Sequence, residues 1–274
     1  MDAMTAAGVL AAARTAGVER LDAQALLQFV TGQSRVWLLA HDDEPLATEA
    51  AAQIAALLAR RAAGEPLAYL VGEREFHGLS LQVSPAVLIP RPDTETLVDW
   101  ALELLPADST AAVADLGTGS GAIALALKRA RPGARVTAVD ASPAALAQAR
   151  ANGARLGLAV EWLASDWWQA LAGRRFELVL SNPPYIDEHD PHLAALRFEP
   201  LVALTSGLDG LDAIRTILAA AAAHLQPGAW LLLEHGHTQA AAVSELLTAA
   251  GFEAVQSRRD LAGQTRCSGG QRPR

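Results

Sequence analysis

Four consecutive residues, Asn182-Pro183-Pro184-Tyr185, carry the clearest chemical signal in the sequence and directly follow an apolar run. An amide nitrogen is a poor nucleophile because its lone pair is delocalised into the carbonyl. The Asn182 side-chain oxygen and the Pro183 carbonyl can each accept one hydrogen from a substrate NH2 group, which aims the nitrogen lone pair at an electrophile. Tyr185 can pack flat against a planar group, and the prolines stiffen the loop. The pattern predicts catalysis by orientation, with no dedicated strong base.

A glycine-rich segment, Asp115-Leu116-Gly117-Thr118-Gly119-Ser120-Gly121, follows another apolar run and opens a helical pattern. Glycine lets the backbone approach a ligand closely, and the first turn of a helix offers free N–H groups. The glycine spacing departs from the G-x-G-x-x-G of dehydrogenases. Asp140 stands 19 residues after Gly121, where its carboxylate can accept hydrogen bonds from two ribose hydroxyls. The predicted cofactor contacts are therefore Gly117, Thr118, Gly119, Ser120, Gly121 and Asp140.

Three further residues, Ser165-Asp166-Trp167, follow the next apolar run. Asp166 can supply a polar contact and Trp167 an aromatic wall for an adenine ring, although a large aromatic residue also packs well in a core. Glu234 and His235 end a later apolar run, and either a structural or an acid–base role is open for them. His77, His189 and His192 lack carboxylate or cysteine partners at ligand spacing, so no metal site is predicted.

Strands and helices alternate from about Asp93 onward. The expected strands are Ala111–Leu116, Arg135–Asp140, Val160–Leu163, Phe176–Leu180 and Trp230–Glu234, with helices at Ile123–Arg131 and Leu211–Leu225. Such alternation predicts a mostly parallel sheet with helices on both faces. The candidate site residues come directly after these strands, and ligands bind at that edge of open α/β sheets.

The first part of the chain has a different pattern. Apolar residues recur at helical spacing from Thr5 to about Gly64, which predicts a small helical bundle with Asp22 as the cap of its second helix. Residues 73–83 are expected to form a hairpin that turns at His77-Gly78, and Pro90-Arg91-Pro92 stiffens the passage into the second region. The predicted domains are a helical domain 1–72, a hairpin linker 73–90 and an α/β domain 91–274.

Composition excludes several classes of protein. The 274 residues carry a formal net charge of −8, which disfavours stable binding to free nucleic acid. The single cysteine cannot form an internal disulfide, no run approaches about 18 apolar residues, and the start lacks a basic signal region. We expect a cytoplasmic protein that does not contact a membrane.

The chain resembles the HemK-type protein-(glutamine-N5) methyltransferases over nearly its whole length. The segments that carry the resemblance are Arg20-Leu21-Asp22-Ala23, Gly64-Glu65-Pro66, Ile89-Pro90-Arg91-Pro92-Asp93-Thr94-Glu95, Asp115–Gly121, Ser165-Asp166-Trp167, Asn182–Glu188, Arg197-Phe198-Glu199-Pro200 and Leu233-Glu234-His235-Gly236. N-P-P-Y alone is shared with DNA methyltransferases, whereas I-P-R-P-D-T-E is much more specific.

This resemblance implies a Rossmann-like class I methyltransferase domain with a mostly parallel seven-stranded sheet, behind a small helical N-terminal domain and a β-hairpin linker. It implies S-adenosyl-L-methionine as the cofactor and methylation of the Gly-Gly-Gln glutamine of class 1 peptide chain release factors. The cofactor contacts would be Gly117–Gly121, Asp140, Trp167 and Asn182, and the substrate contacts Asn182–Tyr185. The N-terminal domain would help to dock the release factor, and we expect a monomer.

The C-terminal region departs from the family pattern. The family closes with an apolar strand, but residues 263–271 here are Gly-Gln-Thr-Arg-Cys-Ser-Gly-Gly-Gln, so a poorly formed last strand is expected. The five arginines within residues 257–274 suggest a solvated tail. Gly269-Gly270-Gln271 repeats the tripeptide that the family methylates. This repeat is either a coincidence or a weak competing substrate on a flexible tail.

Three alternative functions stay open. A ribosomal-protein glutamine methyltransferase would use identical chemistry. A DNA or RNA amino-group methyltransferase would need a basic cleft and a target-recognition region, and neither is evident in the sequence. A non-catalytic cofactor-binding module is disfavoured because Asn182-Pro183-Pro184-Tyr185 is intact.

Overall fold

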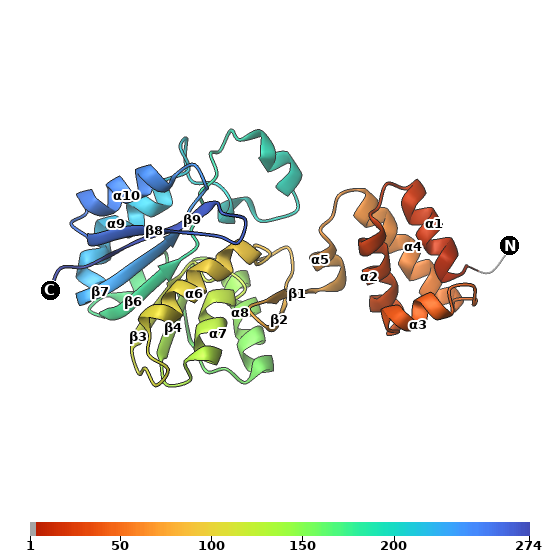
Figure 1. Cartoon of the computed structure of the whole chain (residues 1–274), viewed down its shortest axis with the longest axis horizontal. Coiled ribbons are helices and arrows are strands. Elements are labelled where there is room, and N and C mark those ends of the chain that lie inside the picture. Colours follow the sequence, from red (N-terminus) through yellow and green to blue (C-terminus); the bar gives the residue numbers. More distant parts are fainter. Residues whose placement is uncertain (1–3) are drawn as a thin grey trace. The chain divides into compact units, whose positions relative to one another are not determined.

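The computed structural model describes residues 4–274 and divides into two compact units, one ending at Glu73 and the other beginning at Arg74. The first unit contains the helices α1 (Ala6–Thr15), α2 (Arg20–Thr31), α3 (Arg35–Ala40), α4 (Thr48–Ala62) and α5 (Leu67–Val71). Its core includes Val9, Leu26, Leu27 and Ile54, all fully buried. The helical bundle is therefore as predicted (Figure 1).

Two details of the helical prediction are wrong. Glu19, not Asp22, precedes the first residue of α2, and the Asp22 carboxylate instead binds Arg61 Nε at 2.6 Å. Leu21 and Phe29 belong to the apolar residues at helical spacing that predicted this helix, but they are 63% and 48% exposed. The helical spacing predicted the helix correctly, but the face of α2 that packs into the core carries Ala23, Leu26 and Leu27.

The second unit begins with the predicted hairpin. Strands β1 (Glu73–Phe76) and β2 (Leu79–Gln82) pair, and both turn residues, His77 and Gly78, have positive φ angles. Leu79 and Leu81 are fully buried in the core of this unit. The hairpin is therefore packed against the sheet domain.

Seven strands form the central sheet, in the order β5-β4-β3-β6-β7-β9-β8 (Figure 1). They are β3 (Ala112–Leu116), β4 (Arg135–Asp140), β5 (Glu161–Ala164), β6 (Phe176–Ser181), β7 (Leu225–Glu234), β8 (Glu253–Arg259) and β9 (Thr265–Gln271). The first five pair in parallel, whereas β9 is antiparallel to both β7 and β8. The predicted sheet is confirmed.

Helices cover both faces of the sheet. The core on one face includes residues of α6 (Glu95–Leu104) and α7 (Ala122–Ala130), with the end of α8 (Pro143–Leu156) packed against it. The core on the other face includes residues of α9 (Asp212–His224) and α10 (Ala240–Ala249). Four short 3-10 helices complete the unit: η1 (Pro92–Thr94), η2 (Gln169–Leu171), η3 (Pro191–Leu196) and η4 (Leu201–Ala203).

Strand β7 is longer than predicted. It begins at Leu225 and passes through Pro227 and Gly228, residues that usually mark the end of a strand. The register with β6 shifts between Phe176 and Leu178, and this irregularity accommodates them. Within residues 4–274 no helix has both the length and the apolar character that a membrane span requires.

The last strand is well formed, contrary to the sequence prediction. Cys267, Ser268, Gly269 and Gly270 are buried between β7 and β8. A Cβ atom on Gly269 would lie 2.6 Å from Leu232 Cδ2 and 2.9 Å from the Trp100 ring, and one on Gly270 would lie 2.7 Å from Phe252 Cβ. Glycine is thus required here for close packing.

The solvated-tail prediction is also wrong. Gln271 ends β9, and its Nε2 donates to the carbonyl of Gly228 at 2.8 Å. Arg272 continues the pairing through a backbone N–H bond of 2.8 Å to Ala229. The Gly-Gly-Gln tripeptide is a structural part of the sheet, so the competing-substrate hypothesis loses its basis.

We predict that Gly269→Ala lowers the free energy of unfolding by about 1–3 kcal/mol, because the added methyl group overpacks both neighbouring side chains. Urea denaturation followed by tryptophan fluorescence measures the change. A midpoint equal to that of the unmodified protein would contradict the packing argument.

Candidate active site

The carboxyl ends of β3, β4, β5 and β6 surround a cavity of about 330 Å3. Nine of the predicted catalytic and cofactor-binding residues line it: Gly117, Thr118, Gly119, Ser120, Asp140, Asp166, Trp167, Asn182 and Pro184. The cavity lies where the strand order reverses, since the chain runs outward from β3 through β4 to β5 and then continues on its other side with β6. Such switch points are the usual ligand sites of open α/β sheets.

The glycine-rich loop is held to β4 through its backbone N–H groups. The N–H groups of Gly117 and Thr118 both donate to the carbonyl of Val139 at 2.9 Å, and Gly119 N donates to Asp140 Oδ2 at 2.9 Å. Asp140 Oδ1 accepts from Ser142 N at 2.8 Å. The carboxylate is therefore fixed at the cavity wall, and each of its oxygens keeps a lone pair for a hydroxyl donor.

Asp115 lies beneath this loop and is fully buried. The Thr118 hydroxyl donates to its Oδ2 at 2.6 Å, while Oδ1 has no hydrogen-bond partner among the described residues. Burial raises the pKa of Asp115 to about 7, and the Thr118 hydrogen bond offsets part of the rise. Asp115 thus holds the loop from below and does not line the cavity.

Gly121 lies behind the cavity. A Cβ there would come within 3.0 Å of the Trp162 ring and 3.1 Å of Leu125 Cδ1. Its φ angle is 85°, and it immediately precedes α7. The structure therefore gives this glycine a role in packing α7, whereas the other residues of the loop face the cavity.

Two adjacent tryptophans have different environments. Trp167 has a φ of 48°, lines the cavity and comes within 3.5 Å of where a Gly117 Cβ would be. Trp168 is 6% exposed, stacks on His224 and donates from Nε1 to the carbonyl of Ile217 at 2.9 Å. The core position thus belongs to Trp168, and Trp167 is available as a wall for an aromatic ligand.

The loop after β6 presents its polar group to the cavity. Asn182 Nδ2 donates to the Thr94 hydroxyl at 3.2 Å. The other end of the same amide, Oδ1, is buried without a hydrogen-bond partner within residues 4–274. Leaving a buried acceptor unpaired costs about 1–3 kcal/mol, so an unpaired oxygen at a cavity indicates a binding group.

Tyr185 and Pro183 do not line the cavity. Pro183 is buried, and the Tyr185 hydroxyl donates to Glu234 Oε1 at 3.3 Å. Burial and the nearby Glu234 raise the pKa of Tyr185, which keeps the hydroxyl protonated. In this structure Tyr185 therefore braces the loop against the end of β7.

Glu234 is a buried titratable group at the end of β7, 1% exposed. Burial raises its pKa to about 7, against lowering by hydrogen bonds from Thr94 and Tyr185 and by the charge of Arg266. The neighbouring His235 is also buried, and burial lowers its pKa. Its Nε2 lies 2.8 Å from Ser268 Oγ and its Nδ1 2.8 Å from the carbonyl of Gly236. Both side chains contact other protein groups, which favours the structural role over the acid–base role.

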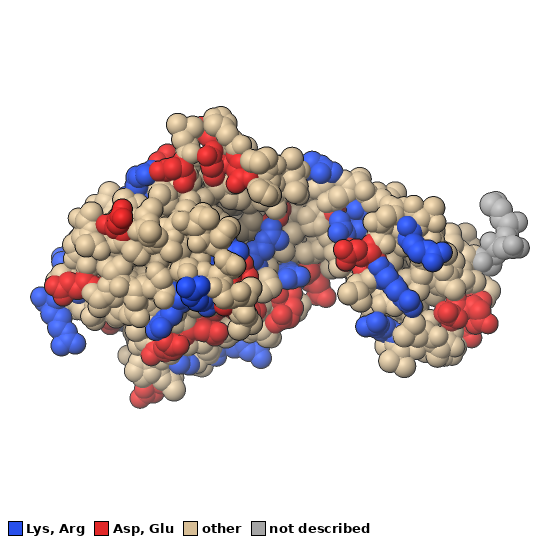
Figure 2. All heavy atoms as spheres, turned by 45° about the horizontal axis from the view of Figure 1, so that its top comes forward, with Lys and Arg blue, Asp and Glu red and all other residues tan. Residues whose placement is uncertain are grey.

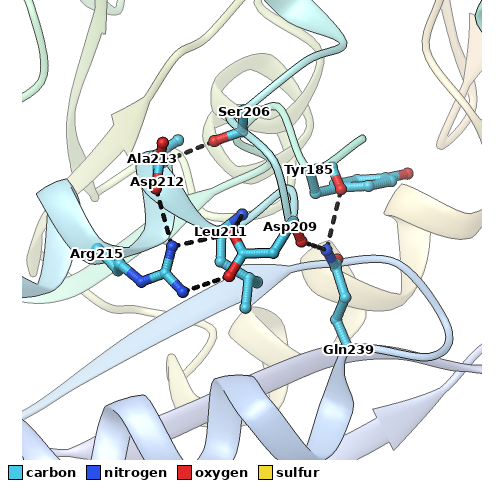
Figure 3. Close-up of polar contacts among 8 residues, drawn as sticks. All are labelled: Tyr185, Ser206, Asp209, Leu211, Asp212, Ala213, Arg215 and Gln239. Carbon is cyan, nitrogen blue, oxygen red and sulfur yellow. Dashed lines mark hydrogen bonds and ion pairs between the residues drawn. The ribbon is translucent and has the colours of Figure 1, made fainter. Parts of the chain in front are cut away.

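Residues 186–211 form an excursion that leaves the sheet after the loop and returns at α9. Gln239 joins the beginning and the end of this excursion. Its Nε2 donates at 3.0 Å to the carbonyls of both Tyr185 and Asp209, as Figure 3 shows. Gly210 has a φ of 72°, and a Cβ there would overlap the Tyr185 carbonyl. The middle of the excursion contributes Pro200, Val202 and Ala203 to the cavity wall.

Several lining residues were missed from the sequence: Ala86, Val87, Leu88, Pro90, Arg91, Thr94, Pro200, Val202 and Ala203. Four of these belong to or adjoin the I-P-R-P-D-T-E segment. Its strong family resemblance was the available signal, because the segment had been interpreted only as a stiff connection. Arg91 binds the buried carboxylate of Glu199, which ties this segment to the excursion.

The residues of the cavity suit S-adenosylmethionine. Asp140 can accept from ribose hydroxyls, Trp167 can cover a purine, and the unpaired Asn182 oxygen lies across the same space. When bound, this cofactor supplies a methyl group activated by a sulfonium. The fold and cavity together define a class I methyltransferase that depends on S-adenosylmethionine.

Comparisons with known proteins agree. The PrmC N-terminal domain family matches residues 4–72, and the methyltransferase small domain family matches residues 95–198. The release factor glutamine methyltransferase of Burkholderia pseudomallei is 54% identical over 95% of this chain and 94% of its own. The release factor glutamine methyltransferase of Xylella fastidiosa (strain Temecula1) is 52% identical over 96% of this chain and 97% of its own. A solved methyltransferase from Pyrococcus furiosus, 18% identical, shares the fold with a TM-score of 0.56 over 72% of this chain and 90% of its own. The chain belongs to the release factor glutamine methyltransferase family.

We predict that Glu234→Gln changes how stability depends on pH. Because folding raises the pKa of Glu234 to about 7, its contribution to stability is fully present below its ordinary pKa of 4.5 and is lost as pH rises through 7. A glutamine cannot ionise, so the variant should gain stability relative to the parent by up to about 3 kcal/mol between pH 5 and pH 8. Urea denaturation at both pH values tests this, and a difference that stays constant with pH would contradict it.

Gly210→Ala should lower turnover about tenfold or more, because its methyl group must push away the Tyr185 carbonyl and so displace the loop after β6. Gly173→Ala is the matched control. Its φ is also positive, at 75°, but among the described atoms none lies within 4 Å of the added Cβ. The control should lose only about 1 kcal/mol of stability from backbone strain and keep its turnover. Equal turnover in both variants would refute the loop displacement.

Proposed function

We propose that this chain transfers a methyl group from S-adenosylmethionine to the side-chain amide nitrogen (N5) of the glutamine in the Gly-Gly-Gln motif of class 1 peptide chain release factors, thereby modulating translation termination. One observation carries the proposal: the buried, unpaired Oδ1 of Asn182 at the cavity. An acceptor in that position suits a donor such as NH2. The names of the relatives, which share about half of their residues with this chain, point to the same substrate.

In the proposed mechanism, Asn182 Oδ1 accepts one hydrogen of the substrate amide. The Pro183 carbonyl, which does not line the cavity in this structure, accepts the other once the substrate is bound. This pins the nitrogen and directs its lone pair toward the cofactor side of the cavity. Pro183 and Pro184 keep the loop rigid, so little ordering is needed at the moment of transfer. S-adenosylmethionine, held by the glycine loop and Asp140, would supply the methyl group, and its sulfonium would leave as a neutral thioether. The methylated nitrogen is cationic and loses a proton to water, so no protein base is required.

The remaining roles follow from position. We assign the ribose hydroxyls to Asp140, the adenine to Trp167 and Asp166, and the rest of the cofactor to the backbone of Gly117, Thr118, Gly119 and Ser120. Gly121 contributes by allowing α7 to pack closely. Tyr185 would have to rotate away from Glu234 to stack on the substrate amide, so we assign it first to bracing the loop.

The alternatives have less support. On the face drawn in Figure 2, Lys and Arg side chains are interspersed with Asp and Glu and form no continuous basic cleft for DNA or RNA. A non-catalytic module would have no use for the unpaired Asn182 oxygen. A ribosomal-protein glutamine would fit the same chemistry, and the names of the relatives favour release factors. We further propose that the protein acts as a monomer in the cytoplasm, where release factors function.

Incubation of the purified protein with S-adenosylmethionine and a purified class 1 release factor tests the proposal. We expect the mass of one methyl group to be added to the peptide that contains Gly-Gly-Gln, and none when that glutamine is replaced by alanine. Methylation of a ribosomal protein in its place, or of no protein, would overturn the proposed substrate.

Asn182→Ala tests the mechanism in the same assay. Loss of one of the two acceptors should cut turnover by a factor of about 10² or more, because the nitrogen is no longer oriented. Calorimetric titration should still detect cofactor binding, since the glycine loop and Asp140 are unchanged. Near-normal turnover would show that Asn182 does not orient the nitrogen.

A further inference from the structure

The orientation of the Asn182 amide decides whether the cavity offers an acceptor or a donor. The two ends of a carboxamide have nearly the same size, so a flip about the last side-chain bond changes the shape of the cavity very little. It would, however, place Nδ2 where Oδ1 now lies, and an NH2 group cannot accept a hydrogen from the substrate NH2. Something must therefore hold the amide in one of its two orientations.

Thr94 is the group in contact with the amide. It is the last residue of η1, is 4% exposed, and its hydroxyl oxygen lies 3.2 Å from Asn182 Nδ2. A hydroxyl can both accept and donate, so Thr94 by itself would tolerate either end of the amide. The direction of its single hydrogen settles which end it binds.

Glu234 offers an acceptor for that hydrogen. Its Oε1 accepts from Tyr185, whereas Oε2 has no partner at hydrogen-bonding distance in the part of the chain that is described. The Thr94 hydroxyl is near enough to lower the pKa of this carboxyl, which burial raises. Arg266 favours the ionised form as well, while Asp93 opposes it. In its ionised form Glu234 can only accept, so a Thr94 hydrogen turned toward it leaves the oxygen lone pairs of Thr94 for Nδ2.

We propose that Thr94 is a positioning residue for methyl transfer: its hydroxyl accepts from Nδ2 and so fixes the Asn182 amide with Oδ1 toward the acceptor nitrogen. The proposal rests on the proposed function of Asn182 and extends it to a second residue of the cavity wall, which acts through its contact with Asn182. It also gives the D-T-E part of the I-P-R-P-D-T-E segment a chemical role.

Thr94→Val removes the hydroxyl and keeps the shape of the side chain, and Thr94→Ser keeps the hydroxyl. We expect Thr94→Val to lower kcat for release-factor methylation roughly 5- to 10-fold with KM nearly unchanged, as for the loss of one orienting hydrogen bond. Thr94→Ser should recover most of the lost kcat.

Thr137→Val is the matched control for loss of a buried hydroxyl. Thr137 is 2% exposed on β4, and its hydroxyl binds Glu161 at 2.8 Å, away from the residues that line the cavity. This variant should lose stability without losing kcat. A fall in kcat as large as that of Thr94→Val would attribute the effect to general destabilisation and overturn the proposal.

A spectroscopic measurement tests the orientation without turnover. The sequence contains two asparagines, Asn152 and Asn182, so protein labelled with 15N-asparagine gives two side-chain amide signals. Asn152 donates at 2.9 Å to the carbonyls of Gln82 and Ser120 and accepts from Gln82 N, which makes it an internal reference. In Thr94→Val the Asn182 signal should shift and its hydrogens should exchange faster with water, while the Asn152 signal stays in place.

The outcomes separate this inference from the proposed function. If the unmodified protein does not methylate release factors, the proposed function fails, and the amide signals still test the contact between Thr94 and Asn182. If it does methylate them, kcat within twofold of the parent in Thr94→Val, or an equal loss in Thr94→Ser, overturns the positioning role. An unchanged Asn182 signal in Thr94→Val overturns it as well.

Discussion

The need to hold an unpaired acceptor rigidly in a buried place governs this structure. An isolated carbonyl oxygen in that state is unfavourable by about 1–3 kcal/mol, so the surrounding fold must be stable enough to retain it. Asn182 directly follows β6, a strand in the middle of the sheet with parallel neighbours on both sides. Two prolines then restrict the backbone, and the opposite end of the amide is tied to Thr94. The sheet, the two prolines and Thr94 thus fix the position of Asn182 Oδ1.

The same sheet brings the remaining groups to that oxygen. The parallel strands that lie next to one another are separated in sequence by whole helices, yet their carboxyl ends meet at one edge. The glycine loop after β3, Asp140 after β4 and Trp167 after β5 therefore surround one cavity with Asn182. Each side chain is also fixed by neighbours, as Asp140 is by two backbone N–H groups. The sheet and these contacts therefore fix where the groups of the site lie.

Sequence alone predicted what is local. The strand Arg135–Asp140 was placed with the bounds it has, and the loops after the strands were identified, because glycine, proline and apolar alternation act over a few residues. It failed where distant residues decide. Gly269 and Gly270 look unsuited to a strand until Trp100 and Phe252 are known to occupy the space beside them. Thr94 looked like part of a connection, because its partners Asn182 and Glu234 lie far along the chain.

The position of β9 has a consequence for biosynthesis. This strand, Thr265–Gln271, lies between β7 and β8 although both precede it in the chain. While the chain leaves the ribosome, β7 and β8 cannot pair with each other in their final arrangement and expose their edges until β9 arrives. Unpaired strand edges are prone to wrong association. Arg266, which faces Glu234 and so the network behind Asn182, belongs to this late segment. This edge of the sheet, with Arg266 in it, can therefore be completed only after residues 265–271 have been synthesised.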